Sequence, residues 1–210
     1  MEKYYLDHEF EIGVDEAGRG PLIGRVYAGA VIWGELDNSL INDSKKLSAK
    51  KRGVALEWIK DNVKAWGVGY AEPEEIDQIN ILEATKLAMS RAIENLITNF
   101  NLQNQNISLI IDGTGWEKKF TNHKVKSFIK GDSKFKSIAA ASIIAKEYHD
   151  EYIKNLCTSH PELNEKYDLL SNMGYGTKKH LLGLEQHGNS SFHRKSFKPC
   201  CNIFKEKFEP

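Results

Sequence analysis

Cysteine is scarce in this chain of 210 residues, and the three that occur, Cys157, Cys200 and Cys201, form no C-x-x-C pair. An odd and sparse set of cysteines argues against a disulfide framework and fits a reducing cytoplasm. The seven histidines show neither zinc-finger nor H-E-x-x-H spacing, so a zinc site is not expected.

Long hydrophobic runs are missing as well. No uncharged apolar run approaches the roughly 18 residues that indicate a membrane-spanning helix, and the longest candidate, residues 26–34, is short and contains glycines. The first seven residues include acids where a signal peptide needs an apolar stretch. We therefore expect a cytoplasmic protein that has no membrane partner.

The composition is that of a globular protein. Hydrophobic residues make up 40% of the chain and charged residues 28%, with 4 Trp, 8 Tyr and 9 Phe. A chain of this length buries roughly 70% of its unfolded surface, which is enough for one sizeable core. We predict a single domain over residues 1–210, with two small domains as the alternative.

The chain has no excess of charge of either sign, because it contains 29 basic and 29 acidic residues. The basic residues nevertheless gather in residues 43–52, 117–136 and 175–207, which carry local net charges of +4, +5 and +5. An approaching phosphate responds to the charge within a Debye length of about 8 Å rather than to the total. Each run taken singly is also consistent with an ordinary solvated face.

The hydrophobic pattern predicts an α/β chain with about five strands. Strands are expected at residues 10–15, 26–33, 64–71, 107–112 and 125–129. Helices are expected from Ser48 to about residue 62, from Pro73 onward with a break near Asn80, over residues 137–155, and from Thr177 to about residue 186. The tail from residue 188 is predicted to be irregular.

Four acids follow or end predicted strands: Asp15, Glu16, Asp112 and Asp132. Taken singly, each is equally consistent with a turn or a helix cap. Acids at strand ends of an α/β sheet, however, project toward the crevice where ligands usually bind. If the four cluster, their mutual repulsion calls for cations, and carboxylate oxygens suit Mg²⁺. Two such ions can activate water and stabilise the leaving oxygen of a phosphodiester.

The glycines of residues 18–24 resemble a loose dinucleotide fingerprint, but Pro21 and a β-rich run follow where that motif needs a helix. No phosphate-binding G-x-x-x-x-G-K-[ST] motif occurs, so no nucleotide cofactor is expected. The loop instead suits close approach of a ligand, with Arg19 available for a phosphate. Tyr175, between two glycines and ahead of basic residues, suits stacking on a sugar or base and equally an ordinary packed position.

Taken together, these residues closely resemble the ribonuclease HII family. The likeness follows the family's order over nearly the whole chain, and its first segment is highly specific. The matching segments are residues 13–22 (GVDEAGRGPL), 42–47 (NDSKKL), 110–113 (IIDG), 131–133 (GDS), 137–146 (SIAAASIIAK), 174–177 (GYGT) and 193–197 (HRKSF).

The resemblance implies a ribonuclease H-like fold, with a central mixed five-stranded sheet flanked by helices and a helical C-terminal extension from about residue 160. It also implies an endonuclease that cuts the RNA strand of RNA–DNA hybrids and cuts 5′ of single ribonucleotides in duplex DNA, leaving 3′-hydroxyl and 5′-phosphate ends. Mg²⁺ or Mn²⁺ is the implied cofactor.

The same resemblance assigns roles to individual residues. The four acids match the family's catalytic metal ligands, and Gly18, Arg19 and Gly20 match its ribose-sensing loop. Tyr175 matches the tyrosine that packs on the sugar 3′ of the cut. The remaining expected substrate contacts, to backbone phosphates, are Lys45, Lys46 and Arg194.

Two other classes of function remain as alternatives. A non-catalytic nucleic-acid module would keep the fold and the basic segments, and a transposase or junction resolvase would act on DNA that lacks ribose. The four acids argue against the first and the Gly-Arg-Gly loop against the second. We expect a monomer, and residues 203–208 lack the glutamine of a sliding-clamp motif.

Overall fold

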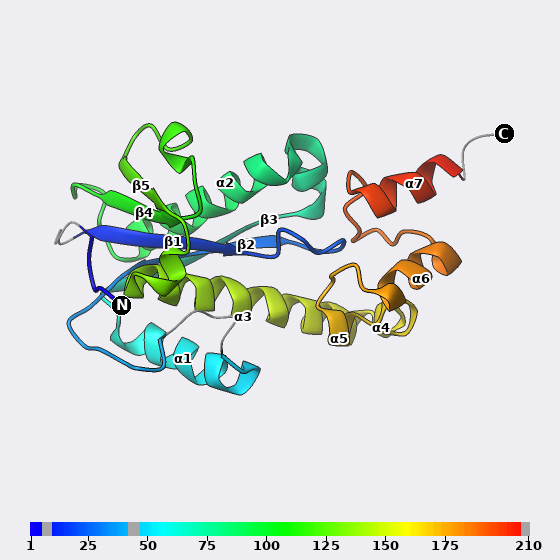
Figure 1. The fold of residues 1–210 in the computed structure, drawn as a ribbon, viewed down its shortest axis with the longest axis horizontal. Coiled ribbons are helices and arrows are strands. Elements are labelled where there is room, and N and C mark those ends of the chain that lie inside the picture. The colour runs from blue at the N-terminus through cyan, green and yellow to red at the C-terminus, as the bar shows by residue number, and fades with distance from the viewer. Residues whose placement is uncertain (6–9, 42–46, 207–210) are drawn as a thin grey trace. The chain divides into compact units, whose positions relative to one another are not determined.

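The computed structural model describes residues 1–5, 10–41 and 47–206, and its chain divides into two compact units (Figure 1). We call the first the sheet unit; it comprises Met1–Ala17, Tyr27–Tyr70 and Thr85–Glu147. The second, the helical unit, comprises Gly18–Val26, Ala71–Ala84 and Tyr148–Pro210. Among the described helices, none has the length and apolar character to cross a membrane.

A five-stranded mixed sheet forms the centre of the sheet unit, in the order β3-β2-β1-β4-β5. β1 pairs antiparallel with β2 and parallel with β4, and β4 pairs parallel with β5. All five predicted strands are confirmed, each within two residues at either end. The strands are β1 (Glu11–Ala17), β2 (Val26–Ile32), β3 (Ala65–Ala71), β4 (Ser108–Asp112) and β5 (Lys124–Phe128).

Helix α3 (Lys136–Ser159) packs against the sheet at very close range because two strand positions lack a side chain. A Cβ at Gly13 would overlap Ser137, and one at Gly29 would overlap the carbonyl of Ala141. Gly13 and Asp15 lie on the same side of β1, since side chains alternate along a strand. Asp15 therefore faces α3.

Helix α2 (Pro73–Asn99) lies on one side of the sheet in Figure 1, and α1 (Ala49–Asn62) and α3 lie on the other. The predicted break in α2 is confirmed, because Asn80 has a non-helical backbone with φ 68° and ψ 165°. The predicted cap of α1 is also confirmed: the Ser48 side chain accepts a hydrogen bond from the amide of Lys51 at 3.4 Å.

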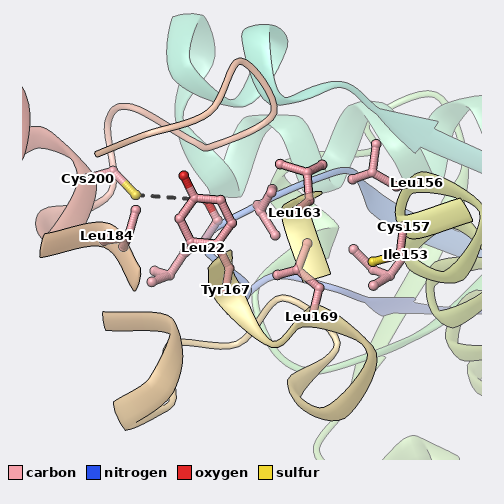
Figure 2. Close-up of a cluster of buried hydrophobic side chains, with 10 residues drawn as sticks. Leu22, Ile153, Leu156, Cys157, Leu163, Tyr167, Leu169, Leu184 and Cys200 are labelled. Atoms are coloured by element: carbon pink, nitrogen blue, oxygen red, sulfur yellow. Dashed lines mark hydrogen bonds between the residues drawn. The ribbon is translucent and has the colours of Figure 1, made fainter. Parts of the chain in front are cut away.

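The helical unit has its own apolar core, which Figure 2 shows around Tyr167. Its helices are α4 (Pro161–Tyr167), α5 (Leu169–Asn172), α6 (Lys178–His187) and α7 (Lys198–Glu206). The prediction of an irregular tail from residue 188 was wrong, because α7 forms with Pro199 in its first turn, where proline is tolerated. The core residues are Leu22, Ile23, Ile153, Leu156, Cys157, Leu163, Tyr167, Leu169, Leu184 and Cys200.

The three cysteines are free, as expected from their number. Cys157 and Cys200 are buried in the apolar core of the helical unit, where Cys200 Sγ lies 4.0 Å from the carbonyl oxygen of Leu22 (Figure 2). Both thiols therefore serve packing, and burial raises the pKa of each above its ordinary value.

Candidate active site

Asp15 and Asp112 meet at the carboxyl ends of the two parallel strands in the middle of the sheet. Val14 pairs with Ile111, so the next residue on each strand is one of these acids. Asp15 is only 5% exposed, whereas Glu16 and Asp112 are partly exposed. Three of the four predicted acids therefore lie near the carboxyl ends of the inner strands β1 and β4.

The fourth acid, Asp132, lies in the single 3₁₀ turn η3 (Gly131–Ser133) that precedes α3. The amide of Gly131 donates a 2.6 Å hydrogen bond to Asp112 Oδ1, which fastens this turn to the end of β4. A Cβ at Gly131 would lie 2.7 Å from Ile138 Cδ1, so a larger residue there would require the Ile138 side chain to shift. Asp132 is 6% exposed and directly follows Gly131, the residue that is hydrogen-bonded to Asp112.

Burial and like charge both act on Asp15. The pKa of Asp15 is raised well above its ordinary value, first by desolvation and then by the charges of Glu16 and Asp112. Hydrogen bonds from the Ser142 side chain and from the Glu16 amide, which donates at 2.8 Å, offset part of this effect. A divalent cation would reverse the remaining penalty by favouring the ionised form.

The donor set fits a hard divalent cation by its chemistry, since all four side chains offer carboxylate oxygens. In the part of the chain that the structure describes, no three His, Cys, Asp or Glu side chains already converge as a set that could hold one ion. The strand register and the attachment of η3 to β4 are thus the features that bring these acids toward one end of the sheet.

The predicted ribose-sensing loop belongs to the helical unit. Gly18 adopts a left-handed backbone with φ 88°, and a Cβ there would lie 3.0 Å from the Arg25 carbonyl oxygen. Arg19 and Gly20 are exposed. A Cβ on Gly20 would lie 3.1 Å from Tyr175 Cε1, and Tyr175 is itself 42% exposed. The structure thus places the loop and Tyr175 side by side, with both accessible to a ligand.

Arg194 is positioned differently from the expectation of a phosphate contact. Its side chain is fully buried, and its guanidinium donates hydrogen bonds to backbone carbonyls of residues 18–25. In this arrangement Arg194 holds the loop rather than facing a ligand, because its buried guanidinium nitrogens already donate to backbone carbonyls. The other two predicted phosphate contacts, Lys45 and Lys46, lie outside the described residues.

Sequence reasoning missed the side chains that support these groups. The Ser142 side chain, within the small-residue run of α3, is hydrogen-bonded to Asp15. The small residues of that run indicated close packing of the helix on the sheet, which was the only sequence signal for this contact. His180 and His193 are buried and contact each other, with ring nitrogens 3.0 Å apart. Thirteen residues separate the two histidines, and no local pattern indicates that they meet.

Comparison with known proteins gives one consistent family. A model of the family described as Ribonuclease HII matches residues 12–200. The chain is 47% identical over 195 residues to a ribonuclease HII of Bacteroides fragilis, with 92% of each chain covered. It is 43% identical over 201 residues to that of Neisseria meningitidis, covering 95% of this chain and 98% of the relative.

Solved structures agree in fold. The ribonuclease H2 of Pyrococcus horikoshii OT3 superposes with a TM-score of 0.69 at 24% identity, covering 95% of this chain and 99% of the other. A Bst-RNase HIII structure in complex with Mn²⁺ gives 0.71 at 18% identity, covering 95% and 71%. The fold is therefore ribonuclease H-like, and the chain belongs to the ribonuclease HII family of metal-dependent endonucleases, which act on the RNA of RNA–DNA hybrids.

Proposed function

We propose that this protein cuts the RNA strand of RNA–DNA hybrids and also cuts 5′ of single ribonucleotides embedded in duplex DNA, leaving 3′-hydroxyl and 5′-phosphate ends. The observation that carries the proposal is Asp15, a carboxylate buried at the end of β1 against Glu16 and Asp112. Buried carboxylates whose pKa is strongly raised by desolvation and like charge cluster at functional sites.

Asp15, Glu16, Asp112 and Asp132 would hold Mg²⁺ or Mn²⁺, and a neighbour of the same fold has been solved with Mn²⁺. When bound, the metal supplies an activated water and charge stabilisation for the leaving oxygen. The protein's own groups orient the ligands: Ser142 and the Glu16 amide orient Asp15, and the Gly131 amide orients Asp112.

Recognition of ribose falls to the exposed loop and the adjacent aromatic ring. Only the 2′-hydroxyl distinguishes RNA from DNA at a single nucleotide. Backbone amides at Arg19 and Gly20 are suited to contact it, and Tyr175 offers a face for the neighbouring sugar. By the family resemblance, Lys45 and Lys46 contact backbone phosphates.

The wider setting is also a proposal. A monomer that needs no nucleotide cofactor fits the lack of a nucleotide-binding motif in the sequence. Three free cysteines suit a reducing cytoplasm. A single catalytic domain with a helical extension from about residue 160 would serve ribonucleotide excision repair and DNA replication. One relative of this fold, from Archaeoglobus fulgidus, was solved as a PCNA complex.

The test is cleavage of a labelled DNA duplex that carries one ribonucleotide, with Mg²⁺, Mn²⁺ or chelator, beside a long RNA–DNA hybrid and an all-DNA duplex. We expect metal-dependent cutting of the first two, with products that a polymerase can extend from their 3′ ends. Cutting of all three duplexes would indicate a general nuclease. Cutting of the hybrid alone would refute the proposal for single ribonucleotides.

A further inference from the structure

A buried polar cluster in the helical unit has no part in the metal site. His180, His193 and Arg194 are each at most 1% exposed. Burying such groups is costly unless every polar atom is bonded. Their hydrogen bonds lead to the two structures proposed to sense ribose, the loop of residues 18–25 and Tyr175.

Arg194 binds the loop at both of its ends. Its Nη2 donates to the carbonyl oxygens of Gly18 at 2.6 Å and Arg25 at 3.0 Å, its Nη1 to that of Arg19 at 3.0 Å, and its Nε to that of Gly24 at 2.8 Å. A planar guanidinium can serve four acceptors at fixed angles, whereas the ammonium of a lysine has three donors and one centre. The loop's shape therefore depends on arginine at this position.

Fixing these carbonyls also fixes the amides that face outward. In a planar trans peptide the carbonyl of one residue and the N–H of the next point in opposite directions. Holding the Gly18 carbonyl toward Arg194 directs the Arg19 N–H away from it, and holding the Arg19 carbonyl does the same for the Gly20 N–H. Arg19 and Gly20 are the exposed residues of the loop.

The two histidines form a chain of hydrogen bonds, here called the histidine relay, that ends at the backbone carbonyl of Tyr175. The amide of Ser190 donates to His193 Nδ1 at 2.9 Å, so this nitrogen is the acceptor and the proton lies on Nε2. His193 Nε2 then donates to His180 Nε2 at 3.0 Å, which leaves His180 Nδ1 to donate to the carbonyl of Tyr175 at 3.0 Å. Burial lowers the pKa of both rings and keeps this neutral arrangement.

Backbone pairing joins the loop, Tyr175 and the segment of residues 190–196 into one frame. The amide of Leu22 donates to the carbonyl of Gly174 and the amide of Arg194 to that of Leu22, both at 2.8 Å. Asp77 anchors the far end of the segment, because its carboxylate accepts hydrogen bonds from the amides of Lys195 at 2.9 Å and Ser196 at 2.8 Å.

We propose that Arg194 and the His193–His180 pair are positioning residues for ribose discrimination: Arg194 aims the outward amides of the loop, and the histidine pair sets the place of Tyr175 beside them. The inference rests on the proposed cutting at single ribonucleotides. A long hybrid offers ribose at every position of its RNA strand and many phosphate contacts. Cleavage of the hybrid therefore depends less on the exact placement of the loop amides and Tyr175.

The experiment compares kcat/KM on a single-ribonucleotide duplex and on a long hybrid for wild type, Arg194→Lys and His180→Phe. We expect the ratio of the two values to fall at least tenfold in both variants, with hybrid cleavage within threefold of wild type. Arg91→Lys is the matched control, since Arg91 also donates to a backbone carbonyl, that of Tyr70, but lies in the sheet unit. Its ratio should not change.

An unchanged ratio in Arg194→Lys, or an equal loss on both substrates, would overturn the positioning role. If Arg194→Lys does not fold, Asp77→Asn decides the question, because it loosens the same segment from its partly exposed end: a threefold or larger fall in the ratio supports the proposal and an unchanged ratio refutes it. A wild type that cannot cut the single-ribonucleotide duplex would instead refute the proposed function.

Discussion

At the scale of single residues, the position of Asp15 favours cation binding but lowers the stability of the metal-free fold. Its burial near the carboxyl end of the central strand β1, beside Glu16 and Asp112, is favourable for holding a cation and unfavourable without one. Two carboxylates about 4 Å apart repel by roughly 4 kcal/mol at an effective dielectric of 20. Without a cation, Asp15 therefore destabilises the fold, although the proposed metal site requires it.

Replacing Asp15 with Asn should separate stability from activity. We expect turnover to fall by about 100-fold or more, since loss of even an indirect metal partner costs 10–100-fold. In chelator the same variant should melt at a higher temperature, by about 2–4 °C for each kcal/mol of relieved repulsion. Because a raised folded-state pKa costs stability only above the unfolded value of about 3.9, this gain should be present at pH 7 and vanish near pH 4.

Asp61→Asn, at an exposed position of α1, is the control and should leave both turnover and melting temperature unchanged. A lower melting temperature for Asp15→Asn in chelator at pH 7 would contradict the destabilising role assigned to Asp15.

Tyr175→Ala tests the ring beside the loop. Stacking of a base on an aromatic ring is worth about 1–3 kcal/mol, and for packing of the sugar on Tyr175 we expect an effect of the same order, a fall in cleavage at a single ribonucleotide of about 5- to 150-fold. Long-hybrid cleavage should fall much less. Equal losses on the two substrates in parallel kinetic assays would argue against a junction role.

At the scale of secondary-structure elements, the placement of Asp15 depends on how closely α3 approaches the sheet. Gly13 and Gly29 permit that approach, and it brings Ser142 of α3 to Asp15. The elements themselves follow from local sequence: the Ser48 and Thr177 caps, the break at Asn80 and all five strands were predictable from neighbouring residues.

Contacts between distant parts of the chain were not predictable in this way. Arg194 bonds to carbonyls about 170 residues earlier in the chain, and its surroundings in sequence indicate only a basic cluster. Helix α7 is similar, because Cys200 is buried against a core built largely from residues 153–184. Local periodicity carries no information about such partners. The same limit applies to the four acids: the sheet register sets Asp15 beside Asp112, and the hydrogen bond from Gly131 to Asp112 ties the turn of Asp132 to β4.

Two glycine-to-alanine substitutions should change stability in opposite directions. Gly13→Ala places a methyl group against Ser137 and should lower the free energy of unfolding by about 1–3 kcal/mol, together with activity. Gly53→Ala, within α1 and with nothing within 4 Å of the new Cβ, should raise it by about 0.5–1 kcal/mol. Urea denaturation measures both, and a stabilising Gly13→Ala would refute the close packing of α3.

At the scale of the whole molecule, the acids proposed to hold the metal and the residues proposed to sense ribose belong to different compact units. The acids lie in the sheet unit, whereas Gly18, Tyr175 and Arg194 lie in the helical unit. The chain passes from one to the other within three residues, since Glu16 and Gly18 are separated only by Ala17. We therefore expect substitutions in the sheet unit to affect mainly the proposed cleavage chemistry and substitutions in the helical unit to affect mainly the proposed ribose recognition.

Acid should destabilise the fold through the buried histidine pair. Burial and the neighbouring His180 lower the pKa of His193 to about 3, whereas an unfolded histidine titrates near 6.5. The unfolded chain thus binds this proton first, and the free energy of unfolding should decline as pH falls from about 6.5 toward 3. Urea denaturation across that range should show a shallower decline for His193→Phe; an identical slope would contradict the neutral relay.

The most direct measurement is single-turnover cleavage of one duplex sequence that carries, at a single position, a ribonucleotide, a deoxyribonucleotide or a 2′-fluoro nucleotide. With Mg²⁺ or Mn²⁺ present, we expect cutting on the 5′ side of the ribonucleotide only, because only that nucleotide offers the proposed loop a 2′-hydroxyl. Comparable cutting of the deoxyribonucleotide duplex would refute our proposal that recognition of ribose controls cleavage at the proposed metal site.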